Sequence, residues 1–150
     1  MISNRTTLFL MSLFLSLPQT GLADNGSRET EFQFRDYTVH YNTFPSMSLD
    51  PKIAKVVGIK RAPYCSVLTI AVKKHGQAQA ISSSKAKISG NAYNLIGQIR
   101  AIKLREIKDG NAIYYVGDFT ALDQENLKFK IFVRPEGESV SQELEFERNF

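Results

Sequence analysis

The chain has 150 residues, a length that suits one domain with a hydrophobic core of its own. Its single cysteine, Cys65, excludes an intramolecular disulfide. The formal net charge is +4, and the basic residues form no dense stripe. This balance argues against a nucleic-acid partner and suits weak attraction to anionic surfaces.

The first 23 residues have the order of parts of a secretory signal peptide. Arg5 lies in a short polar lead, and a nearly continuous apolar run from Leu8 to Leu17 follows it. Small residues precede an expected cleavage after Ala23. The apolar run is too short for a transmembrane helix, which needs roughly 20 residues. We therefore expect export to the periplasm and no transmembrane segment in the mature chain, with a buried N-terminal helix as the alternative.

The mature chain is expected to begin with a flexible polar segment, residues 24–30, followed by a single domain over residues 31–150. Residues 37–42 alternate between apolar and polar side chains, which predicts a half-buried strand. Phe32 and Phe34 alternate in the opposite phase. That change of phase predicts a bulge near Arg35 and Asp36.

One short helix is predicted over residues 51–57. Asp50 is a suitable N-cap, Pro51 suits the first helical position, and Gly58 suits the C-terminal end. A helix of this length is not stable alone, so it must dock on the sheet. Its expected docking face is apolar and consists of Ile53, Val56 and Val57.

The remaining predicted strands cover residues 67–73, 85–93, 99–107, 112–119, 127–133 and 142–150. Asp109-Gly110 is the strongest hairpin signal, because this pair tolerates the positive φ that such turns need. Asn94 to Gly97 is expected to be a tight connection. About seven strands separated by turns predict an all-β fold, namely an antiparallel two-sheet immunoglobulin-like sandwich with one short helix. A small β-barrel is the alternative.

Catalytic options depend on two histidines, His40 and His75. A Ser-His-Asp arrangement would need one of them to meet a serine and an acid in space, and no nucleophile elbow surrounds any serine. A Cys65–His40 pair is a further alternative, although the apolar neighbours of Cys65 favour a buried, unreactive thiol. The sequence has no phosphate-binding glycine loop and no local metal-ligand cluster, so we expect neither a cofactor nor a metal.

Acidic residues alternate along the last predicted strand. A glycosidase needs two carboxyl groups that face each other across a cleft. Alternating glutamates on one strand are instead typical of a solvated face. We expect this role for Glu143, Glu145 and Glu147.

Tyrosines gather around the first strand and the 108–111 hairpin. Tyr114 and Tyr115 are adjacent on a strand, so their side chains point to opposite faces of the sheet. An outward tyrosine beside polar neighbours is a candidate for binding, since tyrosine is favoured at interfaces. The candidate binding residues are Tyr37, His40, Asn42, Tyr114 and Tyr115. The alternative is that most of the tyrosines complete the core.

Several segments together form a distinctive set: Tyr37 to Asn42 with Phe44, Asn94 to Gln98, Arg105 to Tyr115, Leu127 to Phe129, and Leu144 to Phe150. In this order they resemble the domain-of-unknown-function 4426 family, small exported proteins of Gram-negative bacteria. The likeness runs from about Phe32 to Phe150, and Cys65 and the Ser- and Lys-rich residues 77–87 depart from it. The positions that match the family's motifs are His40, Asn42, Asn94, Gly97, Gln98, Glu106 and Gly110. The resemblance implies a periplasmic location and a sandwich-like fold, and it implies no activity.

Two functions follow from these observations. The first is a non-catalytic binding or adaptor module of the cell envelope, which engages an envelope protein through a sheet edge or through loops at one end of the sandwich. The second is a hydrolase or other enzyme with a site around His40. A pocket that places His40 beside a carboxylate and a serine or thiol would favour the enzyme, and His40 on a flat sheet face would favour the module.

Overall fold

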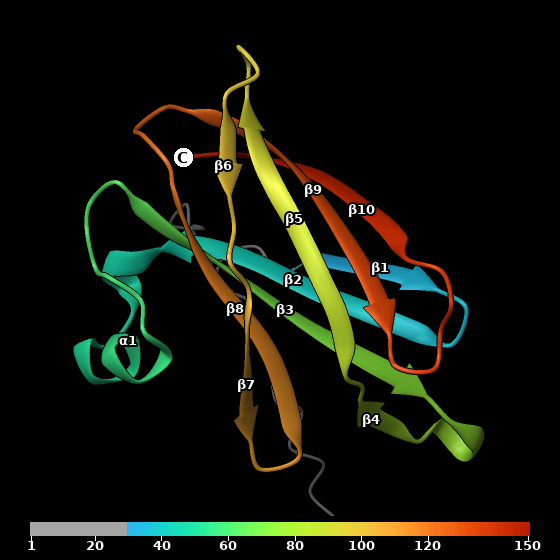
Figure 1. Ribbon diagram of the computed structural model, residues 1–150. Helices are drawn as coiled ribbons and strands as arrows, with labels where there is room; N and C mark the ends of the chain where they lie inside the picture. Colours follow the sequence, from blue (N-terminus) through green and yellow to red (C-terminus); the bar gives the residue numbers. More distant parts are fainter. Residues whose placement is uncertain (1–29) are drawn as a thin grey trace, which may run out of the picture.

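A computed structural model describes residues 30–150, whose strands form two antiparallel sheets packed face to face (Figure 1). The expected signal peptide lies outside the described residues. The strands are β1 (Thr30–Phe34), β2 (Tyr37–Pro45), β3 (Cys65–His75), β4 (Ile81–Ser83), β5 (Ala86–Asn94), β6 (Ile99–Ala101), β7 (Arg105–Asp109), β8 (Ala112–Thr120), β9 (Asn126–Pro135) and β10 (Gln142–Asn149). The helices are α1 (Pro51–Val57) and the short 3₁₀ helices η1 (Ser46–Ser48) and η2 (Gln77–Gln79).

The first sheet has the strand order β1-β2-β3-β8-β7, with β4 paired to one end of β3. The second sheet has the order β10-β9-β5-β6. Neither order closes on itself, so the all-β sandwich is confirmed and the barrel alternative is wrong.

The described part of the chain holds ten strands rather than about seven. Arg35 adopts a positive φ of 47° in a turn between β1 and β2, so the predicted bulge is a hairpin. The predicted strand over 99–107 divides into β6 and β7, which belong to different sheets. The third additional strand is β4, which pairs with Lys73 to His75.

The core lies between the two sheets. Alternate residues of β9, from Leu127 to Val133, are at most 1% exposed, while the lysines between them face outward. The Phe129 ring stacks on Phe146 at 4.5 Å between centroids and meets Phe119 edge-on at 5.1 Å. Both sheets therefore contribute aromatic rings to one packed interior.

Helix α1 begins and ends as the sequence predicts. The Asp50 side chain accepts hydrogen bonds from the backbone N–H groups of Lys52 and Ile53, and Gly58 is the C-cap. The predicted docking face is wrong in part, because Ile53 and Val56 are 52% and 79% exposed. The short helix instead docks through buried Ala54 and half-buried Val57, since a small side chain brings the backbone close to its neighbours. It adjoins a second apolar cluster on the outer face of the first sheet, formed by Ile59, Val67 and Val116 with Phe44, Leu49, Val57 and Ile107.

Candidate binding site at the hairpin between strands β5 and β6

The hairpin that joins β5 to β6 projects from one end of the sandwich (Figure 1). Its tip carries Leu95 and Ile96, which are 87% and 79% exposed, and Ile99 at the start of β6 is 61% exposed. No charged residue occurs from Asn94 to Ile99. Large aliphatic side chains that gather in an exposed, uncharged loop are typical of binding surfaces.

Asn94 closes this hairpin with both its backbone and its side chain. Its carbonyl accepts a hydrogen bond from Gly97 N at 2.9 Å, and its N–H donates to Gln98 O at 3.1 Å. Gly97 has a φ of +79°, as expected for a type I turn followed by a G1 bulge. The bulge diverts the Gln98 N–H from the Asn94 carbonyl, and the Asn94 Oδ1 accepts it at 2.8 Å instead.

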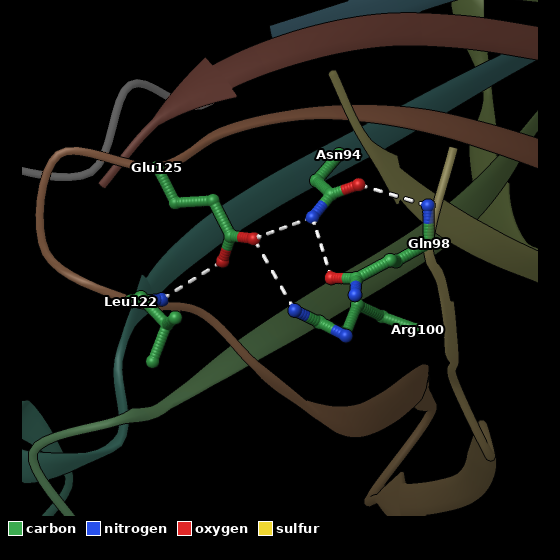
Figure 2. A network of polar contacts seen from close by, with 5 residues as sticks. All are labelled: Asn94, Gln98, Arg100, Leu122 and Glu125. Carbon is green, nitrogen blue, oxygen red and sulfur yellow. Dashed lines mark hydrogen bonds and ion pairs between the residues drawn. The ribbon is translucent and has the colours of Figure 1, made fainter. Parts of the chain in front are cut away.

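A network of polar contacts holds the hairpin against the loop between β8 and β9 (Figure 2). Asn94 Nδ2 donates to Gln98 Oε1 at 2.9 Å and to Glu125 Oε1 at 3.3 Å. Arg100 Nη2 also donates to Glu125 Oε1 at 3.3 Å, and Leu122 N donates to Glu125 Oε2 at 3.0 Å. The Glu125 carboxylate is therefore the shared acceptor at the centre of this network.

The network covers one end of the sandwich core. Buried Ala92 marks the inward face of β5. Asn94 lies two residues from Ala92 on the same strand, and Arg100 pairs with Ala92 across the ladder, so both side chains face inward too. The side chains of Arg100 and Glu125 are only 22% and 13% exposed. The Glu125 carbonyl also accepts a hydrogen bond from Phe150 N at 3.0 Å, just beyond the end of β10.

A cleft of about 430 Å³ adjoins the hairpin. It lies between β6, the end of β8 and the segment that leads into β3, and its lining includes Lys60, Tyr64, Cys65, Ile99, Arg100, Asp118 and Phe119. Tyr64 is 52% exposed at this cleft. Ile99 belongs both to this lining and to the exposed apolar residues of the hairpin, so the cleft adjoins the base of the hairpin.

Cys65 is 8% exposed, which confirms the predicted buried thiol. Burial raises the pKa of this thiol above its usual value of 9.0, although a hydrogen bond with Ser46 acts in the opposite direction. His40 pairs with Ala71, six positions along β3 from Cys65. At the rise of a strand this separation is roughly 20 Å, so the Cys65–His40 pair is excluded.

The five candidate binding residues divide between the two faces of the first sheet. Tyr37 and Tyr115 are 3% and 5% exposed and belong to the core, as the alternative interpretation expected. His40, Asn42 and Tyr114 lie on the opposite, outer face. A binding role for these three residues stays a prediction, whereas burial removes Tyr37 and Tyr115 from the surface.

Tyr115 has a structural role at the edge of the core. Its hydroxyl accepts a hydrogen bond from Ala86 N at 2.7 Å and donates one to Glu106 Oε2 at 3.3 Å. Burial is the main reason that the pKa of Tyr115 lies above its usual value of 10.0. These contacts join β8 to the start of β5 in the facing sheet.

His40 lies on a sheet face, where its neighbours across the ladders are Glu31 and Ala71. The imidazole Nδ1 is 3.3 Å from Glu31 Oε1. Of these two ladder neighbours, Glu31 supplies an acid and Ala71 has no polar side chain, and the hydrolase around His40 stays a prediction.

Two further properties concern the part of the chain that the structure describes. Within residues 30–150, no group of three or more His, Cys, Asp and Glu side chains is arranged to hold a metal ion. In the same range no helix has the length and apolar character that crossing a membrane requires.

Sequence reasoning located the turn at Asn94 to Gly97 but missed its exposed tip. The available signal was the pair Leu95-Ile96 at the central positions of a turn, where polar residues and glycine are usual. Arg100 and Glu125 were also missed, because they are far apart in the sequence and only the fold brings them together.

Comparison with known proteins places the whole described domain in one family. The sequence profile of a domain of unknown function, DUF4426, matches residues 31–150. The crystal structure of a DUF4426 family protein from Pseudomonas aeruginosa PAO1 shares 30% sequence identity with this chain and superposes with a TM-score of 0.71. That match covers 81% of this chain and 94% of the other. No curated protein matches the chain.

Proposed function

The chain belongs to the DUF4426 family, and on that premise we propose that it is a non-catalytic binding module of the cell envelope. It engages an envelope protein through the end of the sandwich that carries the β5–β6 hairpin. Periplasmic location is part of this proposal and rests on the signal-like N-terminal sequence and on the family resemblance. The observation that carries the binding role is the exposed pair Leu95 and Ile96 on a fixed hairpin.

The energetics of the tip support binding. Removing a Leu or Ile side chain from water contributes about 1.5–3 kcal/mol when the side chain becomes fully buried. The contacts of Asn94 with Gln98 and Glu125 restrain the hairpin before a partner binds. A preorganised loop loses less conformational entropy on binding than a mobile one.

The tip alone is too small to form a stable protein interface. A stable protein interface buries about 1,200–2,000 Å² in total, far more than Leu95 and Ile96 can supply. The partner must therefore also contact neighbouring surface, and the cleft with its half-exposed Tyr64 adjoins the base of the hairpin. A protein partner can cover both features at once.

The test is affinity capture of envelope components by the tagged full-length protein, followed by a binding measurement with each captured protein in purified form. The test variant is Leu95→Ser/Ile96→Ser. The matched control is Ile53→Ser/Val56→Ser, which removes a similarly exposed aliphatic pair from α1. We expect the wild type and the control to retain one partner at high salt and the tip variant to lose it.

Equal retention by the tip variant would contradict the proposed function. Retention that disappears at high salt for all three proteins would show charge attraction to an anionic surface instead of a specific interface.

A further inference from the structure

We propose that the free edge of β6 binds an extended segment of the partner as an added strand. This inference rests on the proposed function, because it specifies how the same end of the sandwich engages its partner. Strand β6 is an outer strand of the second sheet, and it borders the cleft beside the hairpin. An added strand needs backbone N–H and C=O groups of β6 that point away from β5.

The register of the hairpin gives those directions. Asn94 and Gln98 form a hydrogen-bonded pair, since Asn94 N donates to Gln98 O. Pairs alternate along an antiparallel ladder, so Ala92 with Arg100 is the next hydrogen-bonded pair. Ile99 and Ala101 occupy the intervening positions. Their N–H and C=O groups therefore point away from β5, toward the open edge.

No neighbouring strand uses these outward groups in residues 30–150. The described ladders pair β6 only with β5, and the backbone hydrogen bonds outside the ladders involve neither Ile99 nor Ala101. An edge of this kind presents the donors and acceptors that an extended peptide needs.

The three other outer strands, β1, β7 and β10, carry charged side chains that oppose strand addition, and on β1 this side chain is Glu31. On β10, Glu143 and Glu145 form ion pairs with Lys130 of β9, at 3.7 Å and 2.7 Å. On β7, Arg105 pairs with Asp118 at 3.0 Å. Charged side chains on an edge are a common protection against unwanted pairing.

Strand β6 has no such protection. Its single charged residue, Arg100, turns inward and pairs with Glu125, while Ile99 and Ala101 are exposed. The short strand β4 is also uncharged, but it pairs with Lys73 to His75, at the far end of β3 from the cleft residue Cys65. The uncharged edge beside the exposed tip is therefore that of β6.

The cleft indicates the chemistry of the bound segment. Alternate side chains of an added strand point to the same side, so some of them would enter the cleft. Tyr64 and Ile99 there suit an apolar side chain. Lys60 and Asp118 both line the cleft, but Asp118 already pairs with Arg105 at 3.0 Å, so the exposed Lys60 is the charge that suits an acidic side chain. The inferred ligand is an extended peptide that has apolar residues at alternate positions and an acidic residue near Lys60.

The experiment selects peptides from a phage-displayed library of random decapeptides on the immobilised full-length protein. Enriched sequences are synthesised, and their affinity is measured by fluorescence anisotropy. The test variant is Ala101→Pro, which removes an outward N–H without removing a ladder hydrogen bond. Ala101→Val is the matched control because it keeps that N–H. We expect binding about tenfold weaker for Ala101→Pro and unchanged for Ala101→Val.

A second measurement guards against misfolding of the proline variant. In the ¹⁵N-labelled wild type, the bound peptide should slow hydrogen exchange at the amides of Ile99 and Ala101. Failure to enrich any peptide, equal binding by Ala101→Pro, or unchanged exchange at both amides would overturn strand addition. The proposed function would still stand if Leu95→Ser/Ile96→Ser loses the captured protein, so the two ideas can fail separately.

Discussion

Asn94, the last residue of β5, and Glu125, in a loop, meet at the end of the sandwich, where Asn94 Nδ2 lies 3.3 Å from Glu125 Oε1. Asn94 closes the β5–β6 hairpin, and Glu125 lies in the connection between β8 and β9. The hydrogen bond between them therefore couples the position of the exposed tip to the rest of the fold.

Glu125→Ala should destabilise the protein by about 1–3 kcal/mol, because it leaves Arg100 largely buried without its ion pair and Leu122 N without an acceptor. Urea unfolding measures the change. Glu147→Ala, at an exposed position on β10, should stay within about 0.5 kcal/mol of the wild type. Equal stability of the two variants would show that the network adds nothing to the fold.

Leu95→Ser/Ile96→Ser should unfold within about 0.5 kcal/mol of the wild type, since both side chains already lie in water. Leu127→Ala, at a position that is 0% exposed, should instead cost about 2–5 kcal/mol. The same urea titration compares the two. A large loss of stability in the tip variant would mean that the tip packs against the protein and is not a free surface.

Gly90→Ala tests a close approach of two backbones. A Cβ at Gly90 would lie 2.4 Å from the Lys130 carbonyl oxygen, so β5 and β9 would have to move apart, at a cost of about 1–3 kcal/mol. Gly97→Ala meets no neighbouring atom, but it carries the strain of a positive φ, about 1–2 kcal/mol. Gly97→Asn should recover part of that loss because asparagine tolerates this conformation. Wild-type stability of Gly90→Ala would contradict the observed spacing.

The Glu145 carboxylate should make the stability of the protein depend on pH in the acidic range. Hydrogen bonds from Lys130 and then Lys128 lower the pKa of Glu145 from 4.5 to about 2. Since the folded pKa is the lower one, this contribution stabilises the fold above about pH 4.5 and is lost as the pH falls toward 2. Glu145→Gln should therefore have a lower melting temperature than the wild type at pH 6, and the two melting temperatures should become nearly equal near pH 2.

Circular dichroism melts at several pH values measure this effect. The difference in melting temperature between Glu145→Gln and the wild type should shrink in about 1 M salt, because Glu145 and its lysine partners are exposed. NMR titration of the Glu145 carboxyl carbon checks the pKa directly. A pKa of Glu145 near 4.5 would contradict the hydrogen bonds that Lys130 and Lys128 donate to this carboxylate.

Cys65 should react slowly with a thiol reagent in the folded protein. It is buried, and burial raises its pKa, so the thiolate fraction at pH 8 is lower than for a free cysteine. Modification by iodoacetamide should become fast only when urea unfolds the chain. Rapid modification under native conditions would mean that a reagent reaches the thiol through the cleft that Cys65 lines.

Local signals account for the parts of the fold that the sequence predicted. Asp50 and Gly58 bound α1, Gly110 marks the β7–β8 hairpin, and the alternation along β9 matches its burial. Each of these depends on residues that are close together in the chain.

The errors have a long-range origin. The strand pattern over 99–107 does not reveal a change of sheet, which happens where Ile102 becomes buried against Gly117 of β8. Burial of Tyr37 and Tyr115 likewise depends on which faces meet across the sandwich, whereas Leu95 and Ile96 are exposed because they lie at the tip of a tight turn. The sequence pattern therefore predicted the candidate site only as a turn.

Glu125 also joins the two outer strands of the second sheet. Its carbonyl accepts from Phe150 beyond the end of β10, and its side chain holds Arg100 of β6, while β9 and β5 lie between them. One residue therefore links the two outer strands, β6 and β10, at the hairpin end of this sheet. A force that a bound partner applies to β6 would then be transmitted through Arg100 and Glu125 to the end of β10.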